Sequence, residues 1–226
     1  MQSRRIRCYV QPQKTPQMKL YDWAAAPNPK RLRMFLVEKG LQIETIQVAG
    51  DGLALTPEYR AAYPQAMVPM LELDDGRQIG ESFSICRYLE ELHPNPPMLG
   101  RDAYERAIVD MWDRRAFDQG MTAVAEMFRN SNPHFKDRGL AGFSGPVPQL
   151  PQLIDRGRAS LAKFFQKFDA QLGTSRFIAG DVFTQADCTL YCSIEFAGWV
   201  SVFMPDDCKN LQRWWNEVSE RPSAKA

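Results

Sequence analysis

Histidine is scarce in this chain, and the motifs behind most protein-borne catalysis are missing. The 226 residues include two histidines, His93 and His134, and neither belongs to an HExxH motif or to a cluster of histidines and cysteines. This argues against a zinc site. The GxSxG turn of serine hydrolases and the GxxxxGK[ST] phosphate loop are also absent. We therefore expect no metal, and we expect any chemistry to be carried by a bound small molecule.

Long apolar runs and a charge excess are lacking as well. The longest uncharged segment, residues 139–154, contains three glycines and three prolines and is too short to cross a bilayer. With 28 basic and 27 acidic residues the net charge is +1, which argues against a nucleic-acid or membrane partner. The five cysteines show no CxxC spacing, which favours the cytoplasm. We interpret Cys188 and Cys192 as core residues.

The first seventeen residues differ from the rest of the chain. They contain Arg4, Arg5, Arg7 and Lys14, no acidic residue and no apolar periodicity. Such a composition predicts a disordered tail. We expect the folded part to begin at Met18.

Residues 18–97 alternate between strand-like and helix-like segments. Asn28 followed by Pro29 offers a helix start, and Gly40 offers a helix end. The Asp-Asp-Gly sequence at 74–76 predicts a hairpin turn. The expected order is a strand at 19–23, a helix at 30–39, a strand at 43–48, a loop or helix, strands at 70–73 and 77–79, and a helix around 85–92. This describes a small α/β domain in which a βαβ unit and a hairpin share one sheet.

Only helical patterns are visible in the rest of the chain. The sequence His-Pro-Asn-Pro-Pro at 93–97 cannot continue a helix and predicts an interdomain linker. Helices are expected at 102–129, 152–172, 185–200 and 208–220, with a loop rich in proline and glycine at 130–151. We therefore expect an all-α second domain over residues 98–226.

Two motifs in the first domain suit a ligand with an amino-acid headgroup. In Met-Val-Pro-Met-Leu at 67–71, Pro69 begins a strand and leaves Val68 with free backbone groups. Such X-Pro bonds can be cis, although an ordinary strand-initiating proline gives the same pattern. Glu81 and Ser82 lie where a strand ends and a helix begins. A hydroxyl and backbone N–H groups there favour a carboxylate, and the glutamate favours an ammonium, although Ser82 could simply cap the helix.

A third motif is structural. In the sequence at 177–187, Thr184 and Asp187 have the spacing of a capping box, in which each side chain satisfies a backbone N–H at a helix start. The box alone is common.

Together, the order of elements and the three motifs resemble the cytosolic glutathione transferase superfamily over residues 18–226. The resemblance implies a thioredoxin-like α/β N-terminal domain, an all-α C-terminal domain and glutathione as co-substrate. It implies that Val68, before a cis Pro69, pairs its backbone with the cysteinyl part of glutathione. Glu81 and Ser82 would hold the γ-glutamyl ammonium and carboxylate. Met67, where the family often has lysine, would contribute only through its backbone.

The thiol-activating position departs from the family. Members use a serine, tyrosine or cysteine just after the first strand, but residues 23–29 are Trp-Ala-Ala-Ala-Pro-Asn-Pro, with Ala26 at the matching position. Asn28 is then the candidate catalytic residue, because its amide can donate a hydrogen bond to the sulfur. It could equally serve only as the cap of the following helix.

These considerations leave three hypotheses for the function. The first is a transferase that joins the glutathione thiolate to an apolar electrophile, held by Trp23, Met111 and Trp112. The second is a reductase of disulfides or peroxides that uses two glutathiones and no protein cysteine. The third is a non-catalytic protein that binds glutathione or a hydrophobic ligand. The resemblance also implies a homodimer.

Overall fold

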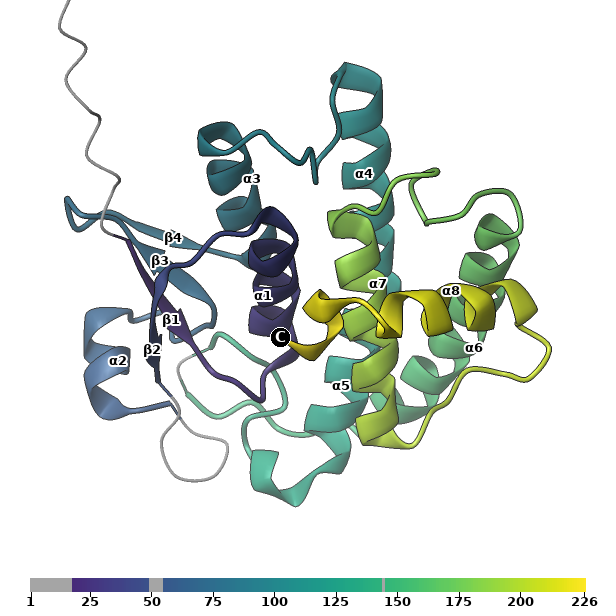
Figure 1. The fold of residues 1–226 in the computed structure, drawn as a ribbon. Helices are drawn as coiled ribbons and strands as arrows, with labels where there is room; N and C mark the ends of the chain where they lie inside the picture. Colours follow the sequence, from purple (N-terminus) through teal and green to yellow (C-terminus); the bar gives the residue numbers. More distant parts are fainter. Residues whose placement is uncertain (1–17, 49–54, 144) are drawn as a thin grey trace, which may run out of the picture.

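Four strands form one mixed sheet in the N-terminal part of the chain (Figure 1). The computed structural model describes residues 18–48, 55–143 and 145–226, so the tail predicted at 1–17 lies outside the described residues. The sheet has the order β2-β1-β3-β4. Strand β1 is parallel to β2, and β3 is antiparallel to both β1 and β4. The strands are β1 (Lys19–Asp22), β2 (Glu44–Gln47), β3 (Met70–Glu72) and β4 (Gln78–Gly80).

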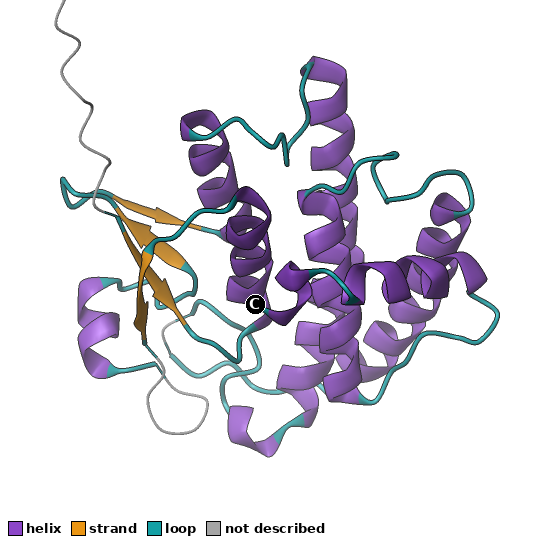
Figure 2. Ribbon diagram, viewed as in Figure 1, coloured by secondary structure: helices purple, strands orange, loops and turns teal. Residues whose placement is uncertain are grey.

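Alternating side chains give the sheet two covered faces. Leu20 and Leu71 point to one face, where they join the main core with α1 (Pro27–Lys39) and α3 (Ser82–Leu92). Met70, the neighbour of Leu71, joins a separate small core with α2 (Pro57–Ala62). The period of two along a strand explains this division, because successive side chains point to opposite faces. Helices therefore cover both faces of the sheet (Figure 2).

Helix α1 begins earlier than the sequence predicted. Its N-cap is Ala26, with Pro27 as the first helical residue, and no side chain caps this end. The expectation that Asn28 is the N-cap and Pro29 the first helical residue is therefore wrong. Both prolines fit within a first turn, where their missing N–H groups cost nothing. Gly40 ends the helix at φ 64°, as predicted, and its N–H donates to the carbonyl of Val37.

The second half of the chain is helical. The helices pack beside one another and against α1 (Figure 1). The segment predicted as one helix at 102–129 is α4, a π-helical turn at Phe117–Met121, and α5. The helices are α4 (Ala103–Ala116), α5 (Thr122–Ser131), α6 (Gln152–Leu172), α7 (Gln185–Ala197) and α8 (Lys209–Ser219), with short 3-10 turns at Pro133–Phe135, Gly198–Val200 and Pro222–Lys225.

A glycine allows the π-helical turn to lie deep among its neighbours. A Cβ atom added to Gly120 would come within 2.7 Å of the ring of Phe164 on α6 and 2.9 Å of the Cβ of Ser193 on α7. No larger residue fits there without movement of these helices. Gly120 therefore permits the close three-way contact.

The capping box predicted at the start of α7 is present. Thr184 is the N-cap, and its backbone N–H donates to Oδ2 of Asp187 over 3.0 Å. The other carboxylate oxygen of Asp187 accepts from the backbone N–H of Ile178 and from the indole N–H of Trp214. Asp187 thus joins the helix start to the preceding loop and to α8, which gives it a wider structural role than the motif alone indicates.

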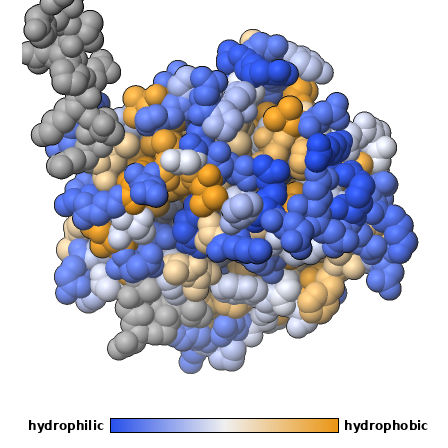
Figure 3. All heavy atoms as spheres, viewed as in Figure 1, coloured by the Kyte–Doolittle hydropathy of each residue, from blue (hydrophilic) through white to orange (hydrophobic). Residues whose placement is uncertain are grey.

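The surface of the face drawn in Figure 3 is mixed, with hydrophobic residues in patches among a majority of hydrophilic ones. None of the helices in the described residues is long and apolar enough to span a membrane.

Candidate functional site

A cavity of about 560 Å³ lies between the sheet-containing part and the helical part. Its wall on the first side comes from the loop before α1, the start of α1 and the segment before β3. Its wall on the second side comes from α5, the end of α7 and the loop after α5. The lining residues include Trp23, Ala26, Asn28, Met67 and Val68 from the first side, and Phe128, Arg129, Phe135, Arg138, Phe196 and Trp199 from the second.

The segment predicted to bind the cysteinyl part of glutathione forms one edge of the cavity. The peptide bond between Val68 and Pro69 is cis, as predicted. Pairing of β3 with β1 begins at Met70, so Val68 precedes the paired part of the strand. The hydroxyl of Tyr59, on α2, donates to the carbonyl of Met67 over 2.6 Å and holds the segment in place. Burial raises the pKa of this tyrosine, so the hydroxyl keeps its proton.

Glu81 and Ser82 lie at the start of α3, as predicted. Glu81 precedes the helix with φ 62°, a left-handed value that a residue other than glycine seldom adopts. Its side chain is exposed, whereas Ser82 is buried. The Ser82 hydroxyl donates to the backbone carbonyl of Asn28 over 2.8 Å. Ser82 is therefore the first helical residue rather than the N-cap, and it joins the starts of α3 and α1.

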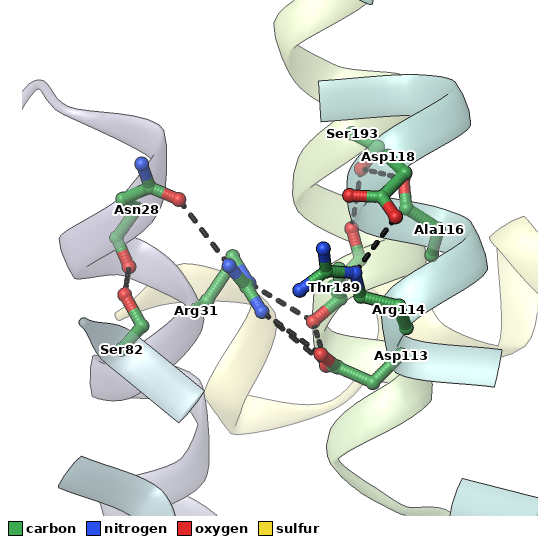
Figure 4. A network of polar contacts seen from close by, with 9 residues as sticks. All are labelled: Asn28, Arg31, Ser82, Asp113, Arg114, Ala116, Asp118, Thr189 and Ser193. Carbon is green, nitrogen blue, oxygen red and sulfur yellow. Dashed lines mark hydrogen bonds and ion pairs between the residues drawn. The ribbon is translucent and has the colours of Figure 1, made fainter. Parts of the chain in front are cut away.

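Asn28 lies in the first turn of α1 and lines the cavity. Its Oδ1 accepts a hydrogen bond from Nη1 of Arg31 over 3.3 Å, and in Figure 4 its amide nitrogen points away from that arginine. Because residues 27 and 29 are prolines, Asn28 supplies the only backbone N–H among the first three helical residues. The side-chain amide and this backbone N–H leave Asn28 as the main hydrogen-bond donor of the turn.

A buried network fixes the arginine that holds Asn28 (Figure 4). Nη2 of Arg31 donates to both carboxylate oxygens of Asp113 on α4, over 3.2 and 3.3 Å, and Nε donates to the hydroxyl of Thr189 on α7 over 2.9 Å. Arg31 and Asp113 are 3% and 4% exposed. Burial raises the pKa of Asp113, against the opposing effects of Arg31 and Thr189. The network connects the start of α1 to the helical half of the protein.

Two of the residues predicted for the second substrate lie elsewhere. Trp23 lines the cavity, but Met111 and Trp112 do not. Trp112 is buried on α4, with its ring edge-on to Phe168 of α6 at 5.6 Å between centroids. Met111 packs against the same core. The expectation for both residues is corrected, because the helical spacing of their side chains reflects packing against α6 and the core.

The residues that do form the second side of the cavity were missed. The ring of Phe128 lies edge-on to those of Phe135, Phe196 and Trp199, at 5.3 to 5.8 Å. Phe135 and Arg138 belong to the segment after α5, which is rich in proline and glycine and shows no helical periodicity. The helical pattern around Phe128 and Arg129 predicts a helix there. The sequence does not indicate which face of that helix borders the cavity.

No cysteine of the described residues lines the cavity. Cys86, Cys188, Cys192 and Cys208 are all buried, and burial raises the pKa of Cys192 to about 12. In the part of the chain that is described, no three histidine, cysteine, aspartate or glutamate residues gather as metal ligands would.

Comparisons with known proteins agree with this architecture. Residues 20–97 match the family model for the glutathione S-transferase N-terminal domain, and residues 117–222 match that for the glutathione S-transferase C-terminal domain. The chain is 31% identical over 214 residues to glutathione S-transferase 2 of Saccharomyces cerevisiae. The aligned region covers 92% of this chain and 88% of the yeast protein.

Solved structures show the same likeness. The crystal structure of Gtt2 from Saccharomyces cerevisiae has a TM-score of 0.81 at 28% identity, covering 92% of this chain and 98% of that one. A glutathione S-transferase domain-containing protein from Marinobacter aquaeolei VT8 has a TM-score of 0.80 at 32% identity, covering 91% and 98% of the two chains.

Proposed function

Because this chain belongs to the glutathione S-transferase family, we propose that it is a glutathione transferase whose bound glutathione thiolate attacks an apolar electrophile. The observation that carries the proposal is the position of Asn28. This residue faces the cavity from the first turn of α1, with its side-chain oxygen engaged by Arg31 and its amide N–H groups left to donate.

In this proposal glutathione lies along the first side of the cavity. The backbone of Val68 pairs with the cysteinyl part, and Met67 contributes through its backbone. Glu81 binds the γ-glutamyl ammonium, and its exposed carboxylate is open to such a partner. Ser82 receives the γ-glutamyl carboxylate at the start of α3 through its backbone N–H, because its hydroxyl donates to the carbonyl of Asn28. The contact between Ser82 and Asn28 places that headgroup site next to the thiol-activating turn.

The donors of Asn28 are sufficient to ionise the thiol near neutral pH. A free thiol has a pKa of about 8.5, and lowering it by two units requires about 2.7 kcal/mol. A charge-assisted hydrogen bond contributes roughly 1.5–3 kcal/mol, and a helix N-terminus about 0.3–1 kcal/mol. The amide of Asn28 and the first turn of α1 together contribute about 1.8–4 kcal/mol, a range that includes the required amount. Arg31, whose charge is paired with Asp113, orients the Asn28 amide through the bond from its Nη1 to Oδ1.

The second substrate would lie against Trp23 and the aromatic residues of the other wall. There are two alternatives. One is a reductase that uses two glutathiones, and the other is a non-catalytic binding protein. We further propose a homodimer in the cytoplasm, as the resemblance implies.

The decisive experiment compares wild type with Asn28→Ala. We expect the variant to keep its affinity for glutathione and to raise the pKa of the bound thiol by about 1–2 units, since one unit corresponds to about 1.4 kcal/mol. Ultraviolet titration of the thiolate measures this pKa. Conjugation of 1-chloro-2,4-dinitrobenzene at pH 7 should fall by roughly 3- to 25-fold, which is the loss of ionised thiol when the pKa rises from about 6.5 to about 7.5–8.5. Asn216→Ala, on the exposed side of α8, is the matched control and should behave as wild type.

A second variant tests whether Asn28 replaces a hydroxyl. Adding Ala26→Ser to Asn28→Ala restores a hydroxyl at the position where the family carries one, and we expect part of the activity to return. Equal thiol pKa values in wild type and Asn28→Ala would refute the role of Asn28. Absence of turnover with any electrophile would favour the binder, and turnover of disulfides or peroxides alone would favour the reductase.

A further inference from the structure

The second side of the cavity carries two positive charges that the proposed reaction does not use. Arg129 comes from the last turn of α5, and Arg138 from the loop after it; both line the cavity. Nη1 of Arg129 donates to the carbonyl of Arg138 over 3.0 Å, and Nη2 of Arg138 donates to the carbonyl of His134 over 2.6 Å. These bonds fix the two guanidinium groups and leave several of their N–H groups without a partner in the described residues.

The two charges also lack a counter-ion. Within the described residues neither arginine forms an ion pair. Of the nearby acids, Glu126 on α5 is paired with Arg156 at 2.9 Å, and Asp137 is exposed and forms no ion pair with its neighbour Arg138. Burial, and to a smaller extent the charge of Arg138, lowers the pKa of Arg129. An anion between the two guanidinium groups would relieve this repulsion.

The surroundings of the pair are aromatic. Both guanidinium groups lie over the ring of Phe135, at 4.7 and 5.3 Å from its centroid. Phe135 in turn contacts Phe128, whose ring borders those of Phe196 and Trp199. The wall therefore offers stacking surfaces next to two donors of fixed geometry, a combination suited to an aromatic acid.

We propose that Arg129 and Arg138 bind a carboxylate on the second substrate, so that the enzyme prefers aromatic electrophiles that carry an acidic group. This inference rests on the proposed function. With a chloronitrobenzoate, the glutathione sulfur forms a bond to the ring carbon that bears chlorine, the carbon–chlorine bond breaks, and chloride leaves. The thiol proton passes to solvent, and no net oxidation occurs. The arginines hold the carboxylate while the thiolate attacks from the side of Asn28.

The test compares two electrophiles of similar shape, the anionic 4-chloro-3-nitrobenzoate and the neutral 4-chloro-3-nitrobenzamide. For each, kcat/KM is divided by the rate constant of the uncatalysed reaction with glutathione. In wild type we expect the acid to be favoured. In the variant Arg129→Gln/Arg138→Gln, kcat/KM for the acid should fall by roughly 10- to 100-fold, the loss expected for charge-assisted hydrogen bonds, and that for the amide should stay nearly unchanged. Arg158→Gln, an exposed arginine of α6 outside the cavity, is the control.

Two results would overturn the inference. An equal loss for acid and amide would mean that the arginines only support the fold, which melting curves of the variants check independently. A higher KM for glutathione with both electrophiles would mean that they bind a carboxylate of glutathione itself. If no electrophile is turned over, the proposed function fails. The inference is then tested by calorimetry with S-(4-carboxy-2-nitrophenyl)glutathione and its carboxamide. Tighter binding of the acid that is lost in the double variant supports it, and equal affinities refute it.

Discussion

Replacing Asp113 with asparagine would leave the guanidinium of Arg31 buried without its counter-ion. Arg31 is 3% exposed and Asp113 4%, and both carboxylate oxygens accept from Nη2 of the arginine. The variant keeps the shape of the side chain and removes its charge. In either orientation of the asparagine it also puts an N–H₂ group against the Nη2 donor of Arg31, where only an acceptor fits.

The expected loss of stability is large. Removal of one partner of a buried ion pair costs about 3–5 kcal/mol, because the remaining charge stays desolvated and unpaired. The raised pKa of Asp113 indicates that burial already opposes its ionised form. The pair should therefore contribute little net stability compared with apolar residues of similar size. We expect Arg31→Met/Asp113→Leu to lose less than the sum of its single substitutions.

Urea unfolding followed by circular dichroism at fixed protein concentration measures these values. Glu105→Gln, which breaks an exposed pair with Arg101, is the control and should cost less than about 1 kcal/mol. Two outcomes would refute the reasoning: an Asp113→Asn variant within about 1 kcal/mol of wild type, or a double variant whose loss equals the sum of the two single losses.

Two further predictions concern titration and thiol chemistry. Partial burial raises the pKa of Glu38, but hydrogen bonds from Arg221 and Ser223 outweigh this and leave it below 4.5. Glu38→Gln should thus lower the free energy of unfolding by roughly 1–2 kcal/mol near pH 7. Urea titrations should show a smaller difference from wild type below about pH 4.5, because wild-type Glu38 takes up its proton there. A difference that does not change with pH would contradict this. The four cysteines of the described residues are buried. In a Cys8→Ser variant, which removes the fifth cysteine, an aromatic disulfide reagent should therefore react only after unfolding. Rapid reaction of the folded variant with this reagent would contradict the burial.

Much of the fold is encoded in local patterns. The strands, the hairpin turn, the cis Val68–Pro69 bond, the end of α1 at Gly40 and the capping box all follow from short stretches of sequence. Each depends on backbone preferences or on contacts between near neighbours. These features sufficed to identify the order of elements around the site, and through it the resemblance.

The first residue of α1 could not be predicted from the preferences of the residues around it. Pro27 and Pro29 can each occupy a first helical turn, and the better capping side chain of Asn28 favoured the later start, whereas the N-cap is Ala26. The choice is made by contacts from distant segments. The Ser82 hydroxyl binds the carbonyl of Asn28, and Arg31, itself held by α4 and α7, binds its side chain.

The second side of the cavity could not be predicted for a related reason. Periodicity identifies the apolar face of a helix, but it does not distinguish a face that meets another helix from one that borders a cavity. Trp112 meets α6, and Phe128 borders the cavity, with similar patterns around both. The path of the loop that brings Arg138 beside Arg129 depends on the whole tertiary structure.

The π-helical turn at Phe117–Met121 sets how far α5 is rotated about the helix axis relative to α4. A π turn holds one residue more than an α turn, and each residue rotates the helix by about 100°. Before the turn, α4 carries Asp113, which anchors Arg31; after it, α5 directs Phe128 and Arg129 at the cavity. Loss or gain of a single residue here would turn the cavity-facing side of α5 while leaving the anchor in place. One insertion would therefore exchange the residues of α5 that border the cavity without changing the first turn of α1.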